Sequence, residues 1–400
     1  MQRIYLDHNA TTPVHPAVLE AMLPYFGPEF GNPSSVHQFG QKANHAIEQA
    51  RESLAALIGA RSSEIVFTSG GTEADNTAIF GAVGHALHAR KEPSAPPHLI
   101  TTVIEHDAVL NSCGALESRG ISVTYLAVDA GGIVSLEAIR AAIRPETALI
   151  SVMYANNEIG ALQPIEEIAR IAAEARVPLH TDAVQAAGKI PIDVKVLGVQ
   201  LLSLSAHKFC GPKGVGALFV RKGVEIDPLL YGGPNERRRR AGTENVAGIV
   251  GLGKAAELAR RDLAETSARM AQLRDRLEKG LLAAIPGARI NGDPMGDPAR
   301  RIPNTSNLLF PGVESESLLI ALDLAGLACS AGAACSSGAV DPSHVLTAIG
   351  LADVEARASV RLSVGRATTE DEVDRALELI PAAVARQRAA SKAGQMAAAQ

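Results

Sequence analysis

Short apolar segments alternate with helical segments through the first half of the chain, and this alternation restricts the fold more than any other feature. The apolar segments have the length of strands, and between most of them apolar residues recur with helical spacing, as in residues 73–89 and 164–175. Strands that alternate with helices predict the α/β class, a mostly parallel sheet covered on both faces. The predicted strands are residues 65–67, 99–104, 123–128, 148–153, 177–181, 201–205 and 216–220.

The pattern changes after about Thr243. Residues 245–285 are rich in Ala, Leu and Arg and carry no strand signal, which predicts a long helix leading into a second domain. Short strands at 306–310 and 359–364, followed by a helix from Thr369 to about Arg388, predict a smaller α+β domain. The tail, 389–400, is rich in Ala, Gln and Ser, and we expect it to be disordered.

Composition and charge argue against several classes of protein. The net charge is −5, so we expect no nucleic-acid partner, and the basic run 237–240 fits a solvated loop or a small-anion site. No apolar run reaches the roughly 18 residues of a membrane helix, and residues 1–6 lack the apolar core of a signal peptide. Four cysteines in 400 residues make no disulfide framework and show no metal-ligand spacing. We therefore expect a cytoplasmic protein without a bound metal.

Lys208 lies just after the predicted strand 201–205 and is followed by a Gly- and Pro-rich turn. A lysine amine becomes a nucleophile when desolvation or nearby charge lowers its pKa, and a cleft at a strand end supplies both. Because ligands of such sheets bind beyond the carboxyl ends of the strands, Lys208 is a candidate to hold a carbonyl cofactor as a Schiff base. A surface lysine before a turn explains the same residues equally well.

Other polar residues follow other predicted strands. Gly70-Gly71-Thr72 lies between a strand and a helix, where free backbone N–H groups favour a phosphate, although the same residues often cap a helix. Asp182 can pair with a protonated ring nitrogen or cap the following helix. His106 and Asn156 lie at two further strand ends. A single histidine is more often structural, but polar residues at successive strand ends predict one ligand site.

These residues belong to a set of ordered motifs that spans the chain. The motifs are Tyr5-Leu6-Asp7-His8-Asn9-Ala10-Thr11-Thr12, Gly31-Asn32-Pro33-Ser34-Ser35, Glu105-His106, Asn156-Asn157-Glu158-Ile159-Gly160, His180-Thr181-Asp182-Ala183-Val184-Gln185, Ser205-Ala206-His207-Lys208 and Arg240-Ala241-Gly242-Thr243-Glu244-Asn245. The set resembles the cysteine desulfurases, fold-type I enzymes that use pyridoxal phosphate. The resemblance extends from about residue 3 to residue 388 and is greatest to the nitrogenase-type and housekeeping iron–sulfur members.

The resemblance implies a homodimer and a division of the chain into parts. A large domain over 16–244 would bind pyridoxal phosphate on a mostly parallel, seven-stranded sheet flanked by helices. A connector helix and the smaller α+β domain would occupy 245–388 and carry a catalytic cysteine loop at about 329–341. The N-terminal segment, 1–15, would join the small domain.

The resemblance also implies a role for each candidate cofactor ligand. Lys208 would form the Schiff base and later move the Cα proton of the substrate, while Asp182 would keep the pyridine nitrogen protonated. His106 would stack on the ring and shuttle protons, and Gln185 would bond the ring hydroxyl. The other cofactor contacts would come from Gly71, Thr72, Ser205 and His207 around the phosphate, from Asn156, and from Thr243 of the partner subunit.

Two substrate ligands and a nucleophile complete the implied site. Arg361 and Asn156 would hold the substrate carboxylate, although Arg361 also fits a structural strand arginine. Cys335, in a segment of small residues, would attack the substrate sulfur as a thiolate. The alternative for Cys335 is a buried, small apolar side chain, and we read Cys113 and Cys210 in that structural sense.

The cysteine segment departs from the usual family sequence, Ser-Ser-Gly-Ser-Ala-Cys-Thr-Ser. Ala331 and Ala333 replace serines, Ser336 replaces threonine, and Cys329 is an additional thiol. The replacements are conservative in size, so they leave the implied activity unchanged. Whether Cys329 pairs with Cys335 depends on a Cα separation below roughly 7 Å, which the sequence does not give.

The implied function is conversion of L-cysteine to L-alanine, with a persulfide on Cys335 that passes to an iron–sulfur scaffold protein. Two alternatives remain. Another fold-type I enzyme, an aminotransferase or a selenocysteine lyase, would share Lys208 and Asp182 but would not need Cys335. A non-catalytic interaction module could have kept the fold. The sequence does not identify the sulfur acceptor or decide whether nitrogenase clusters are the destination.

Overall fold

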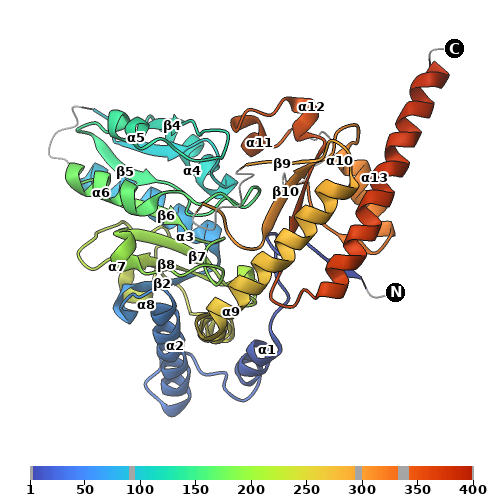
Figure 1. The fold of residues 1–400 in the computed structure, drawn as a ribbon. Coiled ribbons are helices and arrows are strands. Elements are labelled where there is room, and N and C mark those ends of the chain that lie inside the picture. The colour runs from blue at the N-terminus through green and yellow to red at the C-terminus, as the bar shows by residue number, and fades with distance from the viewer. Residues whose placement is uncertain (1–2, 90–94, 293–299, 332–341, 399–400) are drawn as a thin grey trace.

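The computed structural model describes residues 3–89, 95–292, 300–331 and 342–398, and it has two parts joined by a long helix (Figure 1). The larger part is built on a sheet of order β2-β8-β7-β6-β5-β3-β4. All its strands are parallel except β8, which runs antiparallel to β7 and β2. The strands are β2 (Ile65–Thr68), β3 (His98–Thr102), β4 (Ser122–Leu126), β5 (Thr147–Ser151), β6 (Leu179–Asp182), β7 (Leu201–Ser205) and β8 (Gly216–Val220). The predicted α/β class is confirmed.

Helices cover both faces of this sheet because successive strand side chains point to opposite faces. On β2, Val66 packs with α3 and α4, whereas Ile65 and Phe67 pack into the core that includes α2 and α6. The helices of this part are α1 (Pro16–Met22), α2 (Gln38–Leu57), α3 (Gly71–Ala89), α4 (Asp107–Glu117), α5 (Leu136–Ala142), α6 (Ile165–Ala175), α7 (Val194–Leu197) and α8 (Asn235–Arg238).

Helix α9 (Val246–Ala284) joins the two parts. Its first half packs on α2, where a Cβ at Gly253 would lie 2.4 Å from the Ala50 Cα, so only glycine permits this close crossing. Its second half contributes Met270 and Leu277 to the core of the smaller part. The predicted connector, 245–285, agrees with these bounds to within one residue at each end.

The smaller part contains an antiparallel sheet of order β12-β10-β9, and the N-terminal strand β1 pairs in parallel with β11. Helix α13 continues beyond the expected end near Arg388 into the segment that we expected to be disordered. That segment is rich in alanine, which has the highest helix propensity. The elements are β1 (Ile4–Tyr5), β9 (Arg289–Ile290), β10 (Thr305–Leu309), β11 (Leu327–Ala328), β12 (Ser359–Ser363), α10 (Ser315–Leu324), α11 (His344–Ala348), α12 (Asp353–Ala356) and α13 (Glu370–Ala398).

Among the described helices, none combines the length and apolar character needed to cross a bilayer. Within the same residue ranges, no cluster of three or more His, Cys, Asp and Glu side chains is arranged to hold a metal ion.

Candidate active site

A cavity of about 240 Å³ lies at the carboxyl edge of the large sheet. Strands β2, β3, β5, β6 and β7 are parallel, so the residues that follow them converge on this edge. Eight of the sequence-predicted residues line the cavity, namely Gly71, Thr72, His106, Asp182, Gln185, Ser205, His207 and Lys208. Asp75, Met153, Asn157 and Val184 line it as well.

Lys208 ends a 3₁₀ turn (Ala206–Lys208) that follows β7. Its Nζ donates to the backbone oxygens of Asn9 (2.6 Å) and Ala10 (2.9 Å). Burial, with a contribution from the Arg361 charge, lowers the pKa of Lys208 from 10.5 to about 8, although Asp182 and Asp7 oppose the shift. The amine is therefore held by neutral oxygens and has a pKa suited to nucleophilic attack near neutral pH.

Asp182 is buried at the end of β6, and its Oδ1 accepts the Val184 N–H at 2.8 Å. Burial raises the pKa of Asp182, and the His106 and Lys208 charges partly offset this rise. A cationic N–H in the cavity would favour the charged form of this carboxyl group further.

Two further buried carboxyl groups, Asp75 and Glu105, lie close to Asp182, and the sequence analysis assigned a role to neither. Burial and the Asp182 charge raise the pKa of Asp75 well above its usual range, and Asp75 Oδ1 has no hydrogen-bond partner among the described residues. Burial raises the pKa of Glu105 to about 8. Glu105 accepts the Met153 N–H and so holds the end of β5 against the start of α4. The position of Asp75, one helical turn after Gly71, was a signal that could have identified it.

The end of the cavity at helix α3 suits an anion. Gly71 and Thr72 form the first turn of this 19-residue helix, whose N-terminal N–H groups lack helical partners. A Cβ at Gly71 would lie 2.7 Å from Val184 Cγ2, so glycine keeps this end open. His207 Nδ1 lies 3.1 Å from Thr11 Oγ1, and burial with the Lys208 charge lowers the pKa of His207 to about 4. A neutral His207 can therefore contribute one hydrogen bond to an anion at this end of the cavity.

His106 caps helix α4, since its Nδ1 accepts the Ala108 N–H at 3.1 Å. The neutral ring then carries its proton on Nε2. The ring is also exposed at the cavity wall. His106 can therefore cap the helix and still be accessible to a ligand.

Asn156 is not among the described residues that line the cavity. Its Oδ1 accepts the N–H groups of Glu158 and Ile159, and its Nδ2 donates to the backbone oxygen of Ile104. An asparagine at a strand end readily closes such a turn. The neighbouring Asn157 lines the cavity instead, so direct ligand contact by Asn156 would require the release of contacts that hold this turn.

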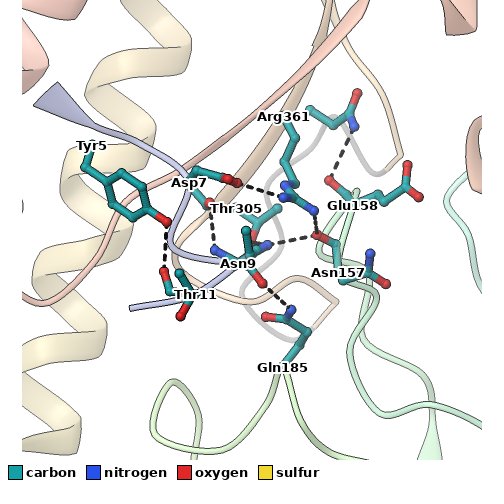
Figure 2. Close-up of polar contacts among 12 residues, drawn as sticks. Tyr5, Asp7, Asn9, Thr11, Asn157, Glu158, Gln185, Thr305 and Arg361 are labelled. Carbon is teal, nitrogen blue, oxygen red and sulfur yellow. Dashed lines mark hydrogen bonds and ion pairs between the residues drawn. The ribbon is translucent and has the colours of Figure 1, made fainter. Parts of the chain in front are cut away.

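Arg361 lies on β12 of the smaller part and, like Asn156, is not among the described residues that line the cavity (Figure 2). Its Nη2 pairs with Asp7 Oδ1 at 2.8 Å, and its Nη1 donates to the Asn157 backbone oxygen at 3.1 Å. The buried Nε has no hydrogen-bond partner among the described residues. An unsatisfied buried donor on a guanidinium is a position where a carboxylate ligand would be stabilised.

Cys335 lies outside the described residues, but the chain on either side of its segment is anchored at the site. Ser330 and Arg361 exchange backbone hydrogen bonds, with Arg361 N–H donating at 2.6 Å. Ser343 Oγ donates to Glu158 Oε2 at 2.6 Å. Both contacts tie residues that flank the segment to the cavity region. Thr243 is exposed and is not among the described residues that line the cavity.

Figure 2 shows Asn9 at the centre of these contacts. Its backbone oxygen accepts from Lys208 Nζ and from Gln185 Nε2. Asn9 Oδ1 accepts from Lys189 Nζ, and Asn9 Nδ2 donates to Thr305 Oγ1. Asn9 was part of a sequence motif without an assigned role, and Lys189 was missed because its contacts depend on the tertiary fold.

A lysine of lowered pKa, a buried carboxylate and a helix N-terminus thus meet around one cavity on this fold. The family model described as Aminotransferase class-V matches residues 4–376. "Cysteine desulfurase IscS" of Methanosarcina thermophila is 52% identical over 385 residues, which cover 96% of this chain and 93% of the relative. "Cysteine desulfurase" of Trichormus azollae is 50% identical over 391 residues, covering 98% and 95%. The chain belongs to the cysteine desulfurases of the class-V aminotransferase family.

Solved structures agree with this family. One described as "NIFS-LIKE PROTEIN" superposes with a TM-score of 0.88 at 39% identity, covering 96% of this chain and all of the other. Another, "SspA in complex with cysteine", has a TM-score of 0.78 at 40% identity, covering 92% of this chain and 100% of the other.

Proposed function

We propose that this cysteine desulfurase uses pyridoxal phosphate to convert L-cysteine to L-alanine, forms a persulfide on Cys335 and supplies that sulfur for iron–sulfur cluster assembly. The observation that carries the proposal is the Lys208 amine, which has a pKa of about 8 and lies in the same cavity as the buried carboxylate of Asp182. The solved complex of SspA with cysteine supports cysteine as the substrate.

The residues of the cavity fit pyridoxal phosphate in three respects. The helix N-terminus at Gly71 suits its phosphate, the carboxylate of Asp182 suits its ring nitrogen, and the amine of Lys208 suits its aldehyde. When bound, this cofactor supplies a carbonyl that condenses with amines and a ring that accepts the electron pair left at the substrate Cα.

The side chains of the chain then have distinct tasks. Lys208 accepts the Cα proton of L-cysteine, because its amine is largely neutral above pH 8. His106, with its Nε2 proton, is placed to donate or accept a proton at the cavity wall. The free Nε of Arg361 offers a hydrogen bond to the substrate carboxylate.

The thiolate of Cys335 attacks the substrate sulfur, so an S–S bond forms as the C–S bond of L-cysteine breaks. The alanine carbon skeleton is then protonated and released. The anchors at Ser330 and Ser343 support this assignment because they connect the cysteine segment to Arg361 and to Glu158. We propose an iron–sulfur scaffold protein as the acceptor and the cytoplasm as the compartment.

We also propose a homodimer in which Thr243 contributes to the partner's phosphate site. A group of exposed apolar side chains between α1 and α2 supports a second copy as the partner, since soluble monomers rarely expose so many together. They are Leu19, Leu23, Phe26, Phe30, Val36 and Phe39, with exposed fractions from 51% to 89%.

A product assay tests the proposed function. Purified protein loaded with pyridoxal phosphate and given L-cysteine with a thiol reductant should release alanine and sulfide in equal amounts. Light scattering on the same sample should give twice the 41.6 kDa chain mass. Amino transfer to a keto acid without sulfide would favour an aminotransferase, and a colourless protein after cofactor addition would favour a non-catalytic module.

Arg361→Lys should raise the KM for L-cysteine about 10- to 100-fold, because lysine cannot offer a planar set of donors to Asp7, Asn157 and a carboxylate together. Initial rates over a range of L-cysteine concentrations measure the change. Arg276→Lys, which alters an exposed ion pair on α9, is the control and should leave the KM unchanged. An unaltered KM in Arg361→Lys would remove Arg361 from the substrate site.

A further inference from the structure

Lys189 is a buried lysine whose two hydrogen-bond acceptors are both neutral amides. It is 4% exposed, and its Nζ donates to Gln185 Oε1 at 2.7 Å and to Asn9 Oδ1 at 3.0 Å. Burial, together with the Lys208 and Arg361 charges, lowers the pKa of Lys189 well below its usual range. Burying a lysine amine against amides alone is unfavourable unless another interaction offsets the cost.

Lys189 and the Asn9 backbone oxygen together determine which way the Gln185 amide points. The two ends of a glutamine amide are nearly isosteric, but Lys189 Nζ donates to one end and the Asn9 backbone oxygen can only accept from the other. Gln185 Oε1 must therefore face Lys189, and Nε2 must lie on the other side, where it donates to the Asn9 backbone oxygen at 2.9 Å. One of the two Nε2 hydrogens makes that bond, and the other remains for a ligand.

Lys189 lies behind Gln185 as seen from the cofactor cavity. Gln185 lines the cavity of about 240 Å³, whereas Lys189 lines a separate one of about 40 Å³. Lys208 borders both cavities. Lys189 is thus hydrogen-bonded directly to Gln185, which is a residue that lines the cofactor cavity.

Asn9 ties the same unit to Lys208 and to the smaller part. Its backbone oxygen accepts hydrogen bonds from Gln185 Nε2 and Lys208 Nζ. Its Oδ1 accepts hydrogen bonds from Lys189 Nζ and Asn304 Nδ2. The orientation of Gln185 is therefore fixed relative to the Lys208 amine, and Figure 2 shows the contact between Gln185 and Asn9.

We propose that Lys189 is a positioning residue that holds Gln185 as a hydrogen-bond donor toward the cofactor cavity, where it stabilises an anionic oxygen on the cofactor ring. The inference rests on the proposed function, because that function assigns the ring hydroxyl to Gln185. Without Lys189, the amide can rotate and present its oxygen, which would repel the same anionic oxygen.

A double-mutant cycle on the cofactor dissociation constant tests this role independently of turnover. Lys189→Met and Gln185→Ala should each weaken binding of pyridoxal phosphate to the apoprotein about 10- to 100-fold, the range for a lost charge-assisted hydrogen bond. In the Gln185→Ala background, Lys189→Met should add less than about a 2-fold change, because its partner is already absent. Lys195→Met, an exposed lysine on α7, is the matched control and should bind as the wild type does.

Additive effects of the two substitutions, or no effect of Lys189→Met, would overturn the inference and leave the proposed function intact. A wild-type protein that binds no pyridoxal phosphate would overturn both the inference about Lys189 and the proposed function. Gln185→Glu keeps the test decisive if Lys189→Met does not fold, since the new carboxylate can pair with Lys189. That variant should melt no lower than the wild type and yet bind the cofactor at least as weakly as Gln185→Ala. Wild-type affinity in Gln185→Glu would contradict the proposed donor role.

Discussion

Cys335→Ala should reduce sulfide release from L-cysteine on the order of 10³-fold or more, because no other residue is proposed to attack the substrate sulfur. Binding of pyridoxal phosphate should remain unchanged, since the residues proposed to contact the cofactor lie at the edge of the large sheet. The measurement is sulfide and alanine formation, with visible absorption as the record of cofactor content.

Cys329→Ala is the matched control for this experiment. Burial, with the Asp7 charge, raises the pKa of the Cys329 thiol to about 12, so it holds almost no thiolate at neutral pH. This variant should keep most of the wild-type rate. Unchanged sulfide release by Cys335→Ala would exclude the persulfide route and favour another fold-type I activity.

Lys208→Ala should lose both the visible absorption of covalently held cofactor and about 10²- to 10⁴-fold in turnover, the range for removal of a general acid–base group. Lys213→Ala tests the specificity of the effect, because Lys213 is an exposed lysine in the same turn and should be dispensable. Persistence of the absorption band in Lys208→Ala would show that another amine holds the cofactor.

Uptake of cofactor by the wild-type apoprotein should depend on pH through the same amine. Only the neutral amine attacks an aldehyde, and the pKa of Lys208 is lowered to about 8. The uptake rate should therefore rise between pH 6 and pH 8 and level off above pH 8. A rate still rising steeply at pH 10 would indicate a lysine of ordinary pKa.

Local pattern was sufficient to predict much of this fold and site. Strands such as 201–205 and 216–220 were predicted with their observed bounds, because a run of apolar residues between turn residues carries its own signal. The residues that follow these strands meet at one edge for a topological reason, so Lys208, Asp182, His106 and the Gly71-Thr72 turn could be predicted to share one site, whereas Gln185, Ser205 and His207 were assigned by the family resemblance.

The features of the site that the sequence did not predict depend on contacts between residues far apart in sequence. Asn9 reaches Lys189 and Asn304 across 180 and 295 positions, and no local pattern reports such a pairing. The motif that contains Asn156 likewise does not reveal that its amide closes a turn. Asp75 and Glu105 resemble ordinary helix-start acids until the sheet buries them.

Asn9 contacts residues that are synthesised at very different times. Its backbone oxygen accepts from Lys208, and its N–H donates to Ser363 Oγ at 3.0 Å. Asn9, which contacts the amine of Lys208, is thus itself held by a residue 354 positions further along the chain. At ribosomal rates of about 5–20 residues per second, the N-terminal segment waits about 20–70 seconds for residue 363 to be synthesised. A nascent chain shorter than 363 residues lacks this contact, so we expect stable cofactor loading only after residue 363 has been synthesised.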